Sequence, residues 1–348
     1  MKKATIIGAC GFGGLGLITI ILKHPGLEIS QLIDRTNVGQ PVSQVFPSLK
    51  GHCDMVVESN ENINYSDVDI VFFSTPDRAG MTLIQDFYSR NIPVIDFSGD
   101  FRFASTEDYT VYARNKGMET EHLAQELLGN TVYGLPELYR DKIKTAKIVG
   151  NPGCFAISMI LALLPAVHNK IINTGSIICD GKTGVSGAGK NPGEANYYPQ
   201  RYENVNTYRE GKHQHLVEVE NVLNSLHQDN IKIFFVPQIV PMTRGILSTI
   251  YCDIAPGYDT GKIESMYHEF YNDSHFVVVR DTSLHTTNVR GSNRCDIRAM
   301  VDARTGKLFI TSAIDNLMKG QSGNAVQNAN IMLGFDEKTG LDIPAFYP

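Results

Sequence analysis

The 348-residue chain lacks several features by which whole classes of protein are identified. It has no dense run of basic residues and a formal net charge of -6, which argues against a nucleic-acid footprint and a polybasic membrane patch. No apolar stretch approaches the length of a membrane span, and the one that follows Met1 is too short for a signal peptide. We therefore expect a cytoplasmic protein with a small-molecule substrate and no nucleic-acid or membrane partner.

The cysteines also lack the spacing of a structural framework. No two of the six form a Cys-x-x-Cys pair or any other tight pair, which argues against a disulfide scaffold and a zinc ribbon. We expect reduced thiols and no metal site. The six are Cys10, Cys53, Cys154, Cys179, Cys252 and Cys295.

The chain contains no internal repeat and no low-complexity linker. Its hydrophobic content of 42% with 20% charged residues is typical of a globular protein. At roughly 150 residues per domain, the length predicts two domains.

One cysteine stands apart from the others by its surroundings. Cys154 follows Asn151-Pro152-Gly153 and opens an apolar run, residues 155–164, that is too long for an ordinary strand and predicts a buried helix. At a helix N-terminus, unpaired backbone N–H groups and the macrodipole favour the thiolate, so Cys154 is a candidate nucleophile. The alternative interpretation is a buried structural cysteine.

The N-terminal segment predicts a dinucleotide or phosphate cradle. An apolar strand at residues 4–7 runs into a glycine-rich loop, and a helical pattern follows. Gly8, Gly11 and Gly14 form G-x-x-G-x-x-G directly after the strand, whereas a literal G-x-G-x-x-G begins three residues later. Such glycines permit a tight turn and close backbone approach, and the helix N-terminus attracts a pyrophosphate, although the same loop could be a simple turn.

The second predicted strand, residues 28–33, ends at Asp34 and Arg35, where an adenosine ribose would lie. An acid there favours the 2′-hydroxyl of NAD, whereas an arginine could pair with the 2′-phosphate of NADP. From these residues alone, both cofactors remain open.

Two further strands complete the predicted first sheet. Residues 69–73 end in Ser74-Thr75-Pro76-Asp77, and residues 92–97 end in Ser98-Gly99-Asp100. Open α/β sheets hold ligands at the carboxyl ends of their parallel strands, so we expect these segments to form one cleft. Taken singly, each could be an ordinary loop.

The second half of the chain predicts a different architecture. Strand-like runs occur at residues 176–180, 232–236, 246–251 and 276–279, and they indicate a mixed sheet backed by a few helices. The first run leads into a second glycine-rich loop, residues 181–190, which lacks P-loop spacing because Lys190 is followed by Asn191. We expect this loop to contact substrate or nicotinamide.

Two histidines precede another helical pattern. His213 and His215 fall at the predicted first turn, before apolar residues at helical spacing. A pair without an evident third ligand is weak evidence for zinc, and exposed histidines that cap a helix are an alternative. A base partner for Cys154 is the sharper interpretation.

Together these motifs, in this order, resemble a known family. The chain resembles the N-acetyl-gamma-glutamyl-phosphate reductases, within the aspartate-semialdehyde dehydrogenase-like group. The resemblance runs nearly end to end. Its segments are residues 8–14, 94–102, 132–137, 151–154, 185–189, 213–215, 240–245, 291–296, 315–320 and 326–328.

The resemblance implies an α/β fold with a Rossmann-like NADP-binding domain, residues 1–150 with 316–348, and an α+β catalytic and dimerisation domain, residues 151–315, with a mixed sheet. A helix over residues 316–333 would return to the first domain. The family generally forms oligomers, here a homodimer or homotetramer. NADPH as reductant favours Arg35 over Asp34. Implied cofactor-binding residues are Gly8, Ala9, Cys10, Gly11, Phe12, Gly14, Arg35, Ser74, Thr75, Pro76, Ser186, Gly187 and Asn328.

The implied reaction is reduction of an N-acylated glutamyl 5-phosphate to its semialdehyde in arginine biosynthesis. Cys154 would form a thioester, with His215 as the preferred acid and base and His213 as the alternative. The arginines Arg102 and Arg244, with Asn151, are the substrate-binding candidates. The sequence departs from the family pattern at Cys10, Phe155 and Gln238, where serine or threonine, tyrosine and histidine are common.

Three rival functions remain at this level. A sister reductase of aspartyl or aminoadipyl phosphate would use the same machinery. A cysteine hydrolase would use a Cys-His pair but would not need a dinucleotide cradle. A non-catalytic NADP-binding sensor would tolerate loss of Cys154.

Overall fold

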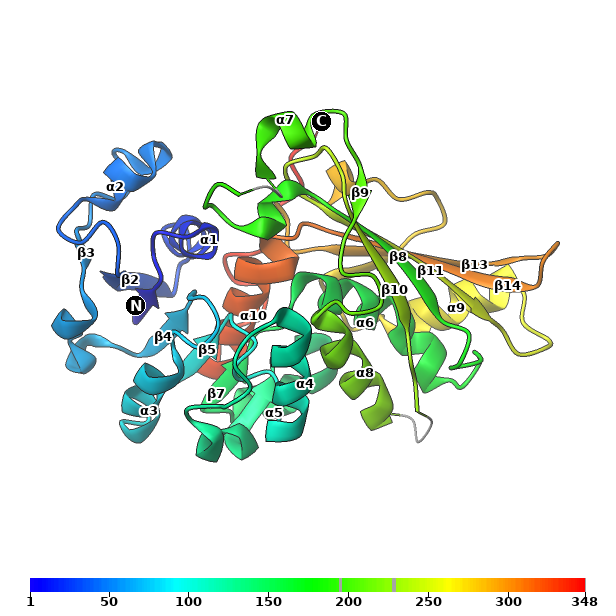
Figure 1. Cartoon of the computed structure of the whole chain (residues 1–348), viewed down its shortest axis with the longest axis horizontal. Helices are drawn as coiled ribbons and strands as arrows, with labels where there is room; N and C mark the ends of the chain where they lie inside the picture. Colours follow the sequence, from blue (N-terminus) through cyan, green and yellow to red (C-terminus); the bar gives the residue numbers. More distant parts are fainter. Residues whose placement is uncertain (194–195, 227–229, 348) are drawn as a thin grey trace. The chain divides into compact units, whose positions relative to one another are not determined.

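The computed structural model describes residues 1–193, 196–226 and 230–347, which form two compact units (Figure 1). The first unit comprises Met1–Arg114, Glu119–Pro152 and Gln321–Asp342. The second comprises Asn115–Met118, Gly153–Gly320 and the described residues from Ile343 onward. The sequence-based division instead placed the return to the first domain at residue 316 and kept residues 343–348 there; Pro348 lies outside the described residues.

A seven-stranded parallel sheet organises the first unit, in the order β3-β2-β1-β4-β5-β7-β6. Its central strands are buried, as expected where both faces of a parallel sheet are covered. The four strands predicted from sequence are present, with ends within two residues of the expected positions. The strands are β1 Lys2–Ile7, β2 Leu27–Ile33, β3 Val57–Glu58, β4 Ile70–Phe73, β5 Val94–Asp96, β6 Thr131–Tyr133 and β7 Ile148–Gly150.

Helices of this unit include one that is distant in sequence from the others. The helix α10 packs against α1 and α5, so the C-terminal segment is part of the first unit's core. It begins at Gly323, not at residue 316 as predicted, because a π-helical turn, Met318–Ser322, precedes it. The α-helices are α1 Phe12–Ile21, α2 Val42–Val45, α3 Met81–Ser89, α4 Thr106–Lys116, whose last residues belong to the second unit, α5 Pro136–Lys144 and α10 Gly323–Leu333.

The second unit is built on a seven-stranded mixed sheet, in the order β12-β13-β14-β11-β8-β10-β9. The pairs β8–β10 and β12–β13 are parallel and the others antiparallel, which confirms the predicted mixed sheet. The long hairpin of β13 and β14 was not predicted. The strands are β8 Ile178–Thr183, β9 Asn206–Thr207, β10 Phe234–Ile239, β11 Ile246–Asp253, β12 Val277–Val279, β13 Cys295–Asp302 and β14 Lys307–Ile314.

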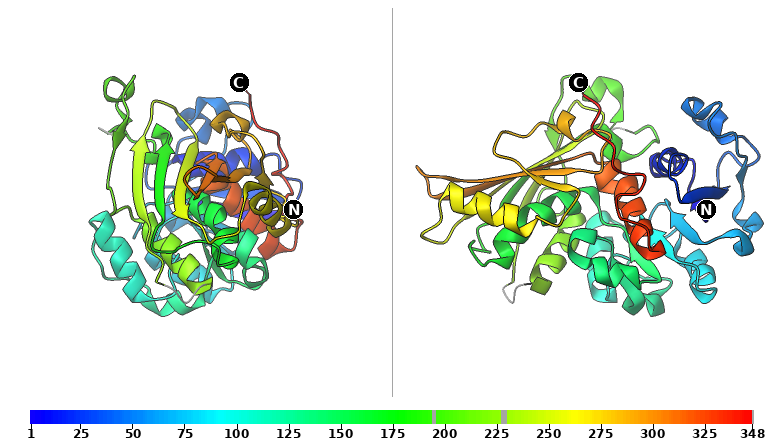
Figure 2. Two further views of the ribbon diagram at one scale, coloured as in Figure 1. Left: turned by 90° about the vertical axis from the view of Figure 1, so that its right-hand side faces the viewer. Right: turned by 180° about the vertical axis from the view of Figure 1, so that it is seen from behind.

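One buried helix forms the centre of this unit. The helix α6, Cys154–His168, is apolar on all sides, and it packs against β11, β13 and β14 as well as against α8 and α9 (Figure 2). A helix that is apolar all round is stable only when it is enclosed. The prediction of a buried helix that begins at Cys154 is confirmed. The other helices are α7 Tyr198–Arg201, α8 His215–Leu226 and α9 Thr260–Phe270.

Two buried carboxyl groups lie at the carboxyl end of β5 in the first unit, where Asp96 is the last residue of the strand and Asp100 follows it. The Ser98 hydroxyl donates a hydrogen bond to Asp96, and the Arg78 N–H donates one to Asp100 Oδ2 at 2.6 Å. Burial raises the pKa of Asp96 to about 6. Burial, with the neighbouring Asp96 carboxylate, raises the pKa of Asp100 to about 7. These two acids therefore oppose each other's ionisation near neutral pH.

We expect Asp100→Asn to flatten the pH dependence of stability. The pKa of Asp100 is higher in the folded protein than in the unfolded chain. The raised pKa therefore contributes stability that is fully present below about pH 4 and is lost as the pH rises through 7. Between pH 5 and pH 8, the free energy of unfolding of the wild type should fall by on the order of 2 kcal/mol relative to the variant. Urea denaturation at both pH values measures this difference. If the difference in the free energy of unfolding between wild type and variant were the same at pH 5 and at pH 8, the prediction would be wrong.

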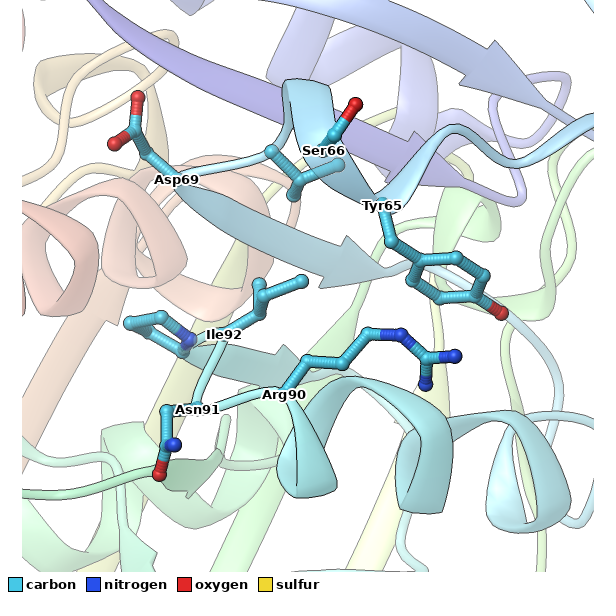
Figure 3. A pocket seen from close by; sticks show the side chains of 8 residues that line it. Tyr65, Ser66, Asp69, Arg90, Asn91 and Ile92 are labelled. Atoms are coloured by element: carbon cyan, nitrogen blue, oxygen red, sulfur yellow. The ribbon is translucent and has the colours of Figure 1, made fainter.

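A shallow pocket of about 590 Å³ lies in the first unit, beside the segments that lead into β4 and β5 (Figure 3). Arg90 lies over the Tyr65 ring, with 4.2 Å between the guanidinium carbon and the ring centroid. Asp69 and Pro93, also in its lining, precede β4 and β5. The pocket therefore lies at the amino ends of these strands, away from the predicted dinucleotide loop at the carboxyl end of β1.

Candidate active site

The predicted dinucleotide loop connects β1 to α1. Gly8 has a φ of +86°, and a β-carbon there would lie 2.4 Å from the Ser74 carbonyl oxygen. A β-carbon at Gly14 would lie 2.4 Å from the Ala9 carbonyl oxygen. These two glycines are therefore required by the close packing of the loop on β4 and on itself.

Gly11 is different, because among the described residues no close contact requires a glycine there. It caps the N-terminus of α1, and a β-carbon would meet only the Gly8 carbonyl oxygen, at 3.8 Å. The helix begins at Phe12 without a side-chain cap, so its first N–H groups can face an anion. A glycine without close neighbours before an uncapped helix end is the arrangement with which such loops bind a pyrophosphate.

The acid and the arginine after β2 have different environments. Asp34 accepts hydrogen bonds from the N–H groups of Cys10 and Thr36, both at 2.9 Å, and from the Thr36 hydroxyl at 2.8 Å. Arg35 is exposed and has no ion pair within the described residues. Asp34 thus holds the glycine loop, whereas the Arg35 guanidinium can turn toward a phosphate.

Two other predicted cofactor residues carry buried oxygens without partners. Thr75 Oγ1, just after β4, and Asn328 Oδ1, on α10, are both buried and accept no hydrogen bond from a described residue. Buried polar atoms are normally satisfied, so both fit the polar groups of a bound cofactor. Ser74 donates its N–H to the Ile7 carbonyl, and Pro76 lies in the loop that follows.

Cys154 is the first residue of α6 in the second unit and is half-buried. Gly153 caps the helix with extended backbone, and no acidic residue lies in the first turn. The helix end therefore presents N–H groups and the positive end of a 15-residue dipole near the sulfur. These features favour a thiolate.

Glu218, a fully buried carboxylate on α8, was not among the predicted site residues. Its Oε2 accepts a hydrogen bond from the Gly153 N–H at 3.0 Å, and its Oε1 lies 4.0 Å from His215 Nε2. His215 and Glu218 are three residues apart, so one helix face carries both. That spacing was the signal available in the sequence. Glu218 thus links the histidine to the backbone that precedes Cys154.

The His215 ring lies directly beside this backbone. A β-carbon at Gly153 would be 2.3 Å from His215 Nε2, so only glycine leaves room for the ring. His215 opens α8, in whose first turn both histidines were predicted to lie. It therefore stands next to the residue that precedes Cys154.

His213 lies two residues before α8 rather than in its first turn. Its ring is buried among Phe155, Tyr208 and Phe235, and its Nδ1 accepts the His215 N–H at 3.2 Å. Burial, with nearby positive charges, holds the pKa of His213 well below its ordinary value. A neutral ring in an aromatic enclosure is suited to holding His215 in place.

The second glycine-rich loop forms a short 3-10 turn, Val185–Ala188. Ser186 is buried, and its hydroxyl accepts a hydrogen bond from Asn316 Nδ2 at 3.0 Å. The Gly187 N–H closes the turn on the Gly184 carbonyl. These two predicted cofactor residues are therefore held rigidly within the second unit.

Two of the predicted substrate residues already have several partners in the first unit. Arg102 donates from Nε to the Asn151 carbonyl at 2.8 Å and from Nη2 to the Phe97 carbonyl at 2.6 Å. The Asn151 side chain donates to the Gln321 carbonyl and accepts from Asn324 and Asn328. The structure thus supports a structural role for both residues, whereas their contact with substrate remains a prediction.

The third predicted substrate residue, Arg244, is half-buried in the second unit and forms an ion pair with Asp315.

Among the described residues, no three His, Cys, Asp or Glu side chains are grouped so as to hold a metal ion. None of the helices that the structure describes, in residues 1–193, 196–226 and 230–347, has the length and apolar character needed to span a membrane. Gln238 donates a hydrogen bond to Asp180 of the neighbouring strand β8.

Comparisons with known protein families give a match for each half of the chain. The semialdehyde dehydrogenase NAD binding domain matches residues 3–146, and the semialdehyde dehydrogenase dimerisation domain matches residues 154–316. The chain is 42% identical to the N-acetyl-gamma-glutamyl-phosphate reductases of Thermoanaerobacter sp. (strain X514) and Geobacter sp. (strain M21), and 38% identical to that of Oceanobacillus iheyensis. Each match covers all of both chains.

The solved structures support the fold. Aspartate semialdehyde dehydrogenase II from Vibrio cholerae superposes with a TM-score of 0.71 at 16% identity, over 96% of this chain and 99% of that one. The Candida albicans enzyme, solved with NADP, gives 0.68 at 16% identity, over 96% and 98%. The predicted fold class and resemblance are confirmed, and the chain belongs to the N-acetyl-gamma-glutamyl-phosphate reductase family of semialdehyde dehydrogenase-like oxidoreductases.

Proposed function

We propose that the chain reduces N-acetylglutamyl 5-phosphate to N-acetylglutamate 5-semialdehyde, with release of phosphate and through a thioester on Cys154. The observation that carries the proposal is the placement of Cys154 at the N-terminus of a buried helix beside the linked pair His215 and Glu218. The names of the full-length relatives support the acyl group and the place in arginine biosynthesis.

In this mechanism His215 takes the thiol proton as the Cys154 sulfur attacks the acyl carbon, and the carbon–oxygen bond to phosphate breaks. The cofactor, when bound, supplies the hydride that reduces the thioester. The N–H groups at the start of α6 stabilise the oxyanion of each tetrahedral state. As the thiohemiacetal collapses, protonated His215 returns its proton to the departing sulfur, which regenerates the thiol. Glu218 orients the imidazole and stabilises its protonated form.

We further propose that the reductant is NADPH rather than NADH. Asp34 uses both carboxylate oxygens within the chain, so it is not free to take a ribose hydroxyl pair, and Arg35 is exposed beside it. An arginine in this position pairs with the 2′-phosphate. The space before Gly11 would hold the pyrophosphate, and Thr75 and Asn328 would bind polar groups of the cofactor.

The reverse reaction tests the proposal. Purified protein is mixed with N-acetylglutamate semialdehyde, phosphate and NADP, and the reduced cofactor is followed by absorbance. We expect phosphate-dependent reduction of NADP and a much slower rate with NAD. Activity with aspartate or aminoadipate semialdehydes in place of the N-acetylated one would assign the chain to a sister reductase. Binding of NADP without any turnover would support the sensor function, and hydrolysis of an acyl substrate without cofactor would support the hydrolase.

We also propose that the second unit forms a homodimer through the face of its sheet that the helices leave open. Phe234, Ile178 and Tyr251 lie side by side on β10, β8 and β11, and they are 58%, 47% and 40% exposed. Tyr251 also pairs with Phe309 on β14. A contiguous apolar row of this kind on a soluble protein indicates an interface. The match to a dimerisation domain supports a second copy as the partner.

We expect Ile178→Lys with Tyr251→Lys to convert the protein to monomer at micromolar concentration. Two ammonium groups in the row would be desolvated without partners if the sheets met. Sedimentation velocity of wild type and variant measures the change. A matched control is Leu123→Lys, which alters a residue of similar exposure (49%) in the first unit and should leave the assembly intact. A wild type that sediments as a monomer would contradict the dimer.

A further inference from the structure

Asp315, the residue that follows β14, connects several segments of the second unit through hydrogen bonds. Asp315 is fully buried, and its carboxylate accepts hydrogen bonds from donors in three segments of the chain. The Arg244 guanidinium donates from Nε at 3.2 Å and from Nη2 at 3.0 Å. The Gly291 N–H donates at 2.7 Å, and the N–H groups of Leu317 and Met318 donate at 2.8 and 3.2 Å.

The first of these contacts sets the direction of an arginine. Asp315 holds the Nε and Nη2 edge of Arg244, and the side chain is one-third exposed. Within the described residues, Nη1 has no partner. A guanidinium fixed along one edge presents its other N–H groups in a defined direction, which is the geometry that a carboxylate or phosphate requires.

The other contacts hold the turn Met318–Ser322, which lies against the candidate nucleophile Cys154. Asp315 captures the N–H groups of Leu317 and Met318, and its own carbonyl accepts the Gly320 N–H at 3.0 Å. Gly320 in turn lies against the nucleophile, because a β-carbon there would be 2.7 Å from Cys154 Cβ. The π-helical turn thus connects the Asp315 carboxylate to the immediate surroundings of Cys154.

We propose that Asp315 is a positioning residue for two parts of the site at once. It orients Arg244 for an anionic group of the substrate, and it holds the turn that packs Gly320 against Cys154. The first role rests on the proposed function, in which Arg244 binds substrate. The second does not, because it concerns the environment of a thiol that can be measured without turnover.

The substitution Asp315→Asn tests both roles. Each hydrogen bond to the Asp315 carboxylate comes from an N–H donor, so an amide nitrogen in its place would face at least one N–H and break that contact. We expect the KM for N-acetylglutamate semialdehyde to rise about tenfold or more. We also expect alkylation of Cys154 by iodoacetamide, followed by mass spectrometry, to become severalfold faster because the turn loosens.

Comparison with Arg244→Ala separates the two roles. That variant should raise the KM without changing the alkylation rate, and Asp315→Asn added to it should raise the KM no further while still speeding alkylation. If Arg244→Ala leaves the KM unchanged, the substrate role of Arg244 fails, and the alkylation result still decides the second role. Independent, multiplicative effects on KM, or an unchanged alkylation rate in Asp315→Asn, would overturn the proposal.

A matched control removes another buried aspartate of the same unit. Asp296 accepts hydrogen bonds from Arg280 and Arg294, at 2.9 and 3.0 Å, and is equally enclosed. Asp296→Asn should lower thermal stability without changing the KM or the alkylation rate, so similar effects in both variants would reveal a merely structural role for Asp315. Should Asp315→Asn not fold, Asp315→Glu displaces the carboxylate by one methylene, and the same KM and alkylation changes are expected.

Discussion

Replacing Cys154 by serine is expected to lower kcat/KM by about 10⁴-fold or more, in either direction of the reaction. A serine hydroxyl is a far weaker nucleophile than a thiolate at neutral pH, and the helix N-terminus that favours the thiolate cannot ionise an alcohol. The reverse assay with phosphate and NADP measures the loss. NADP binding, followed by fluorescence titration, should be retained because the dinucleotide loop lies in the first unit.

A second cysteine of the same unit provides the control. Cys252 is buried in β11, and burial raises the pKa of its thiol to about 12, so it stays protonated and unreactive. Cys252→Ser should therefore retain most of the activity. Full activity of Cys154→Ser would remove the thioester mechanism, because turnover would then not require this sulfur.

Replacing His215 by asparagine is expected to lower kcat by about 10² to 10⁴-fold. The ring stands beside Gly153 and near the Glu218 carboxylate, so it can accept a proton and have its positive charge stabilised. Without it, neither thiol deprotonation nor the final proton transfer to sulfur has a catalyst. The pH profile of kcat/KM should also lose one ionisation.

The matched comparison is His213→Asn. Burial holds the pKa of the enclosed His213 ring well below its ordinary value, so the ring stays neutral near pH 7 and does not take up a second proton. We expect a smaller loss, through a displaced His215, with the ionisation still visible in the profile. A larger loss in His213→Asn than in His215→Asn would exchange the two roles.

Local patterns were sufficient for much of the fold. A strand, a glycine loop and a helix were correctly predicted at the N-terminus, and so was the helix that begins at Cys154, because backbone turns and apolar periodicity act over a few residues. The hairpin β13 and β14 was missed. Continuous apolar runs indicate buried strands, whereas β13 carries polar residues such as Asp296, Arg298 and Asp302 along its length.

Side-chain roles divide in the same way. The candidate nucleophile, the two histidines, the dinucleotide loop and the family could be predicted from the chain's residues, since they lie in short motifs whose order is specific. Three contacts could be recognised only in the folded chain: Glu218 links His215 to Gly153, other parts of the first unit hold Asn151 and Arg102, and Asp315 joins Arg244 to the turn beside Cys154. Most of these contacts connect residues tens of positions apart, and which side chains meet depends on the packing of whole elements, which local periodicity does not specify.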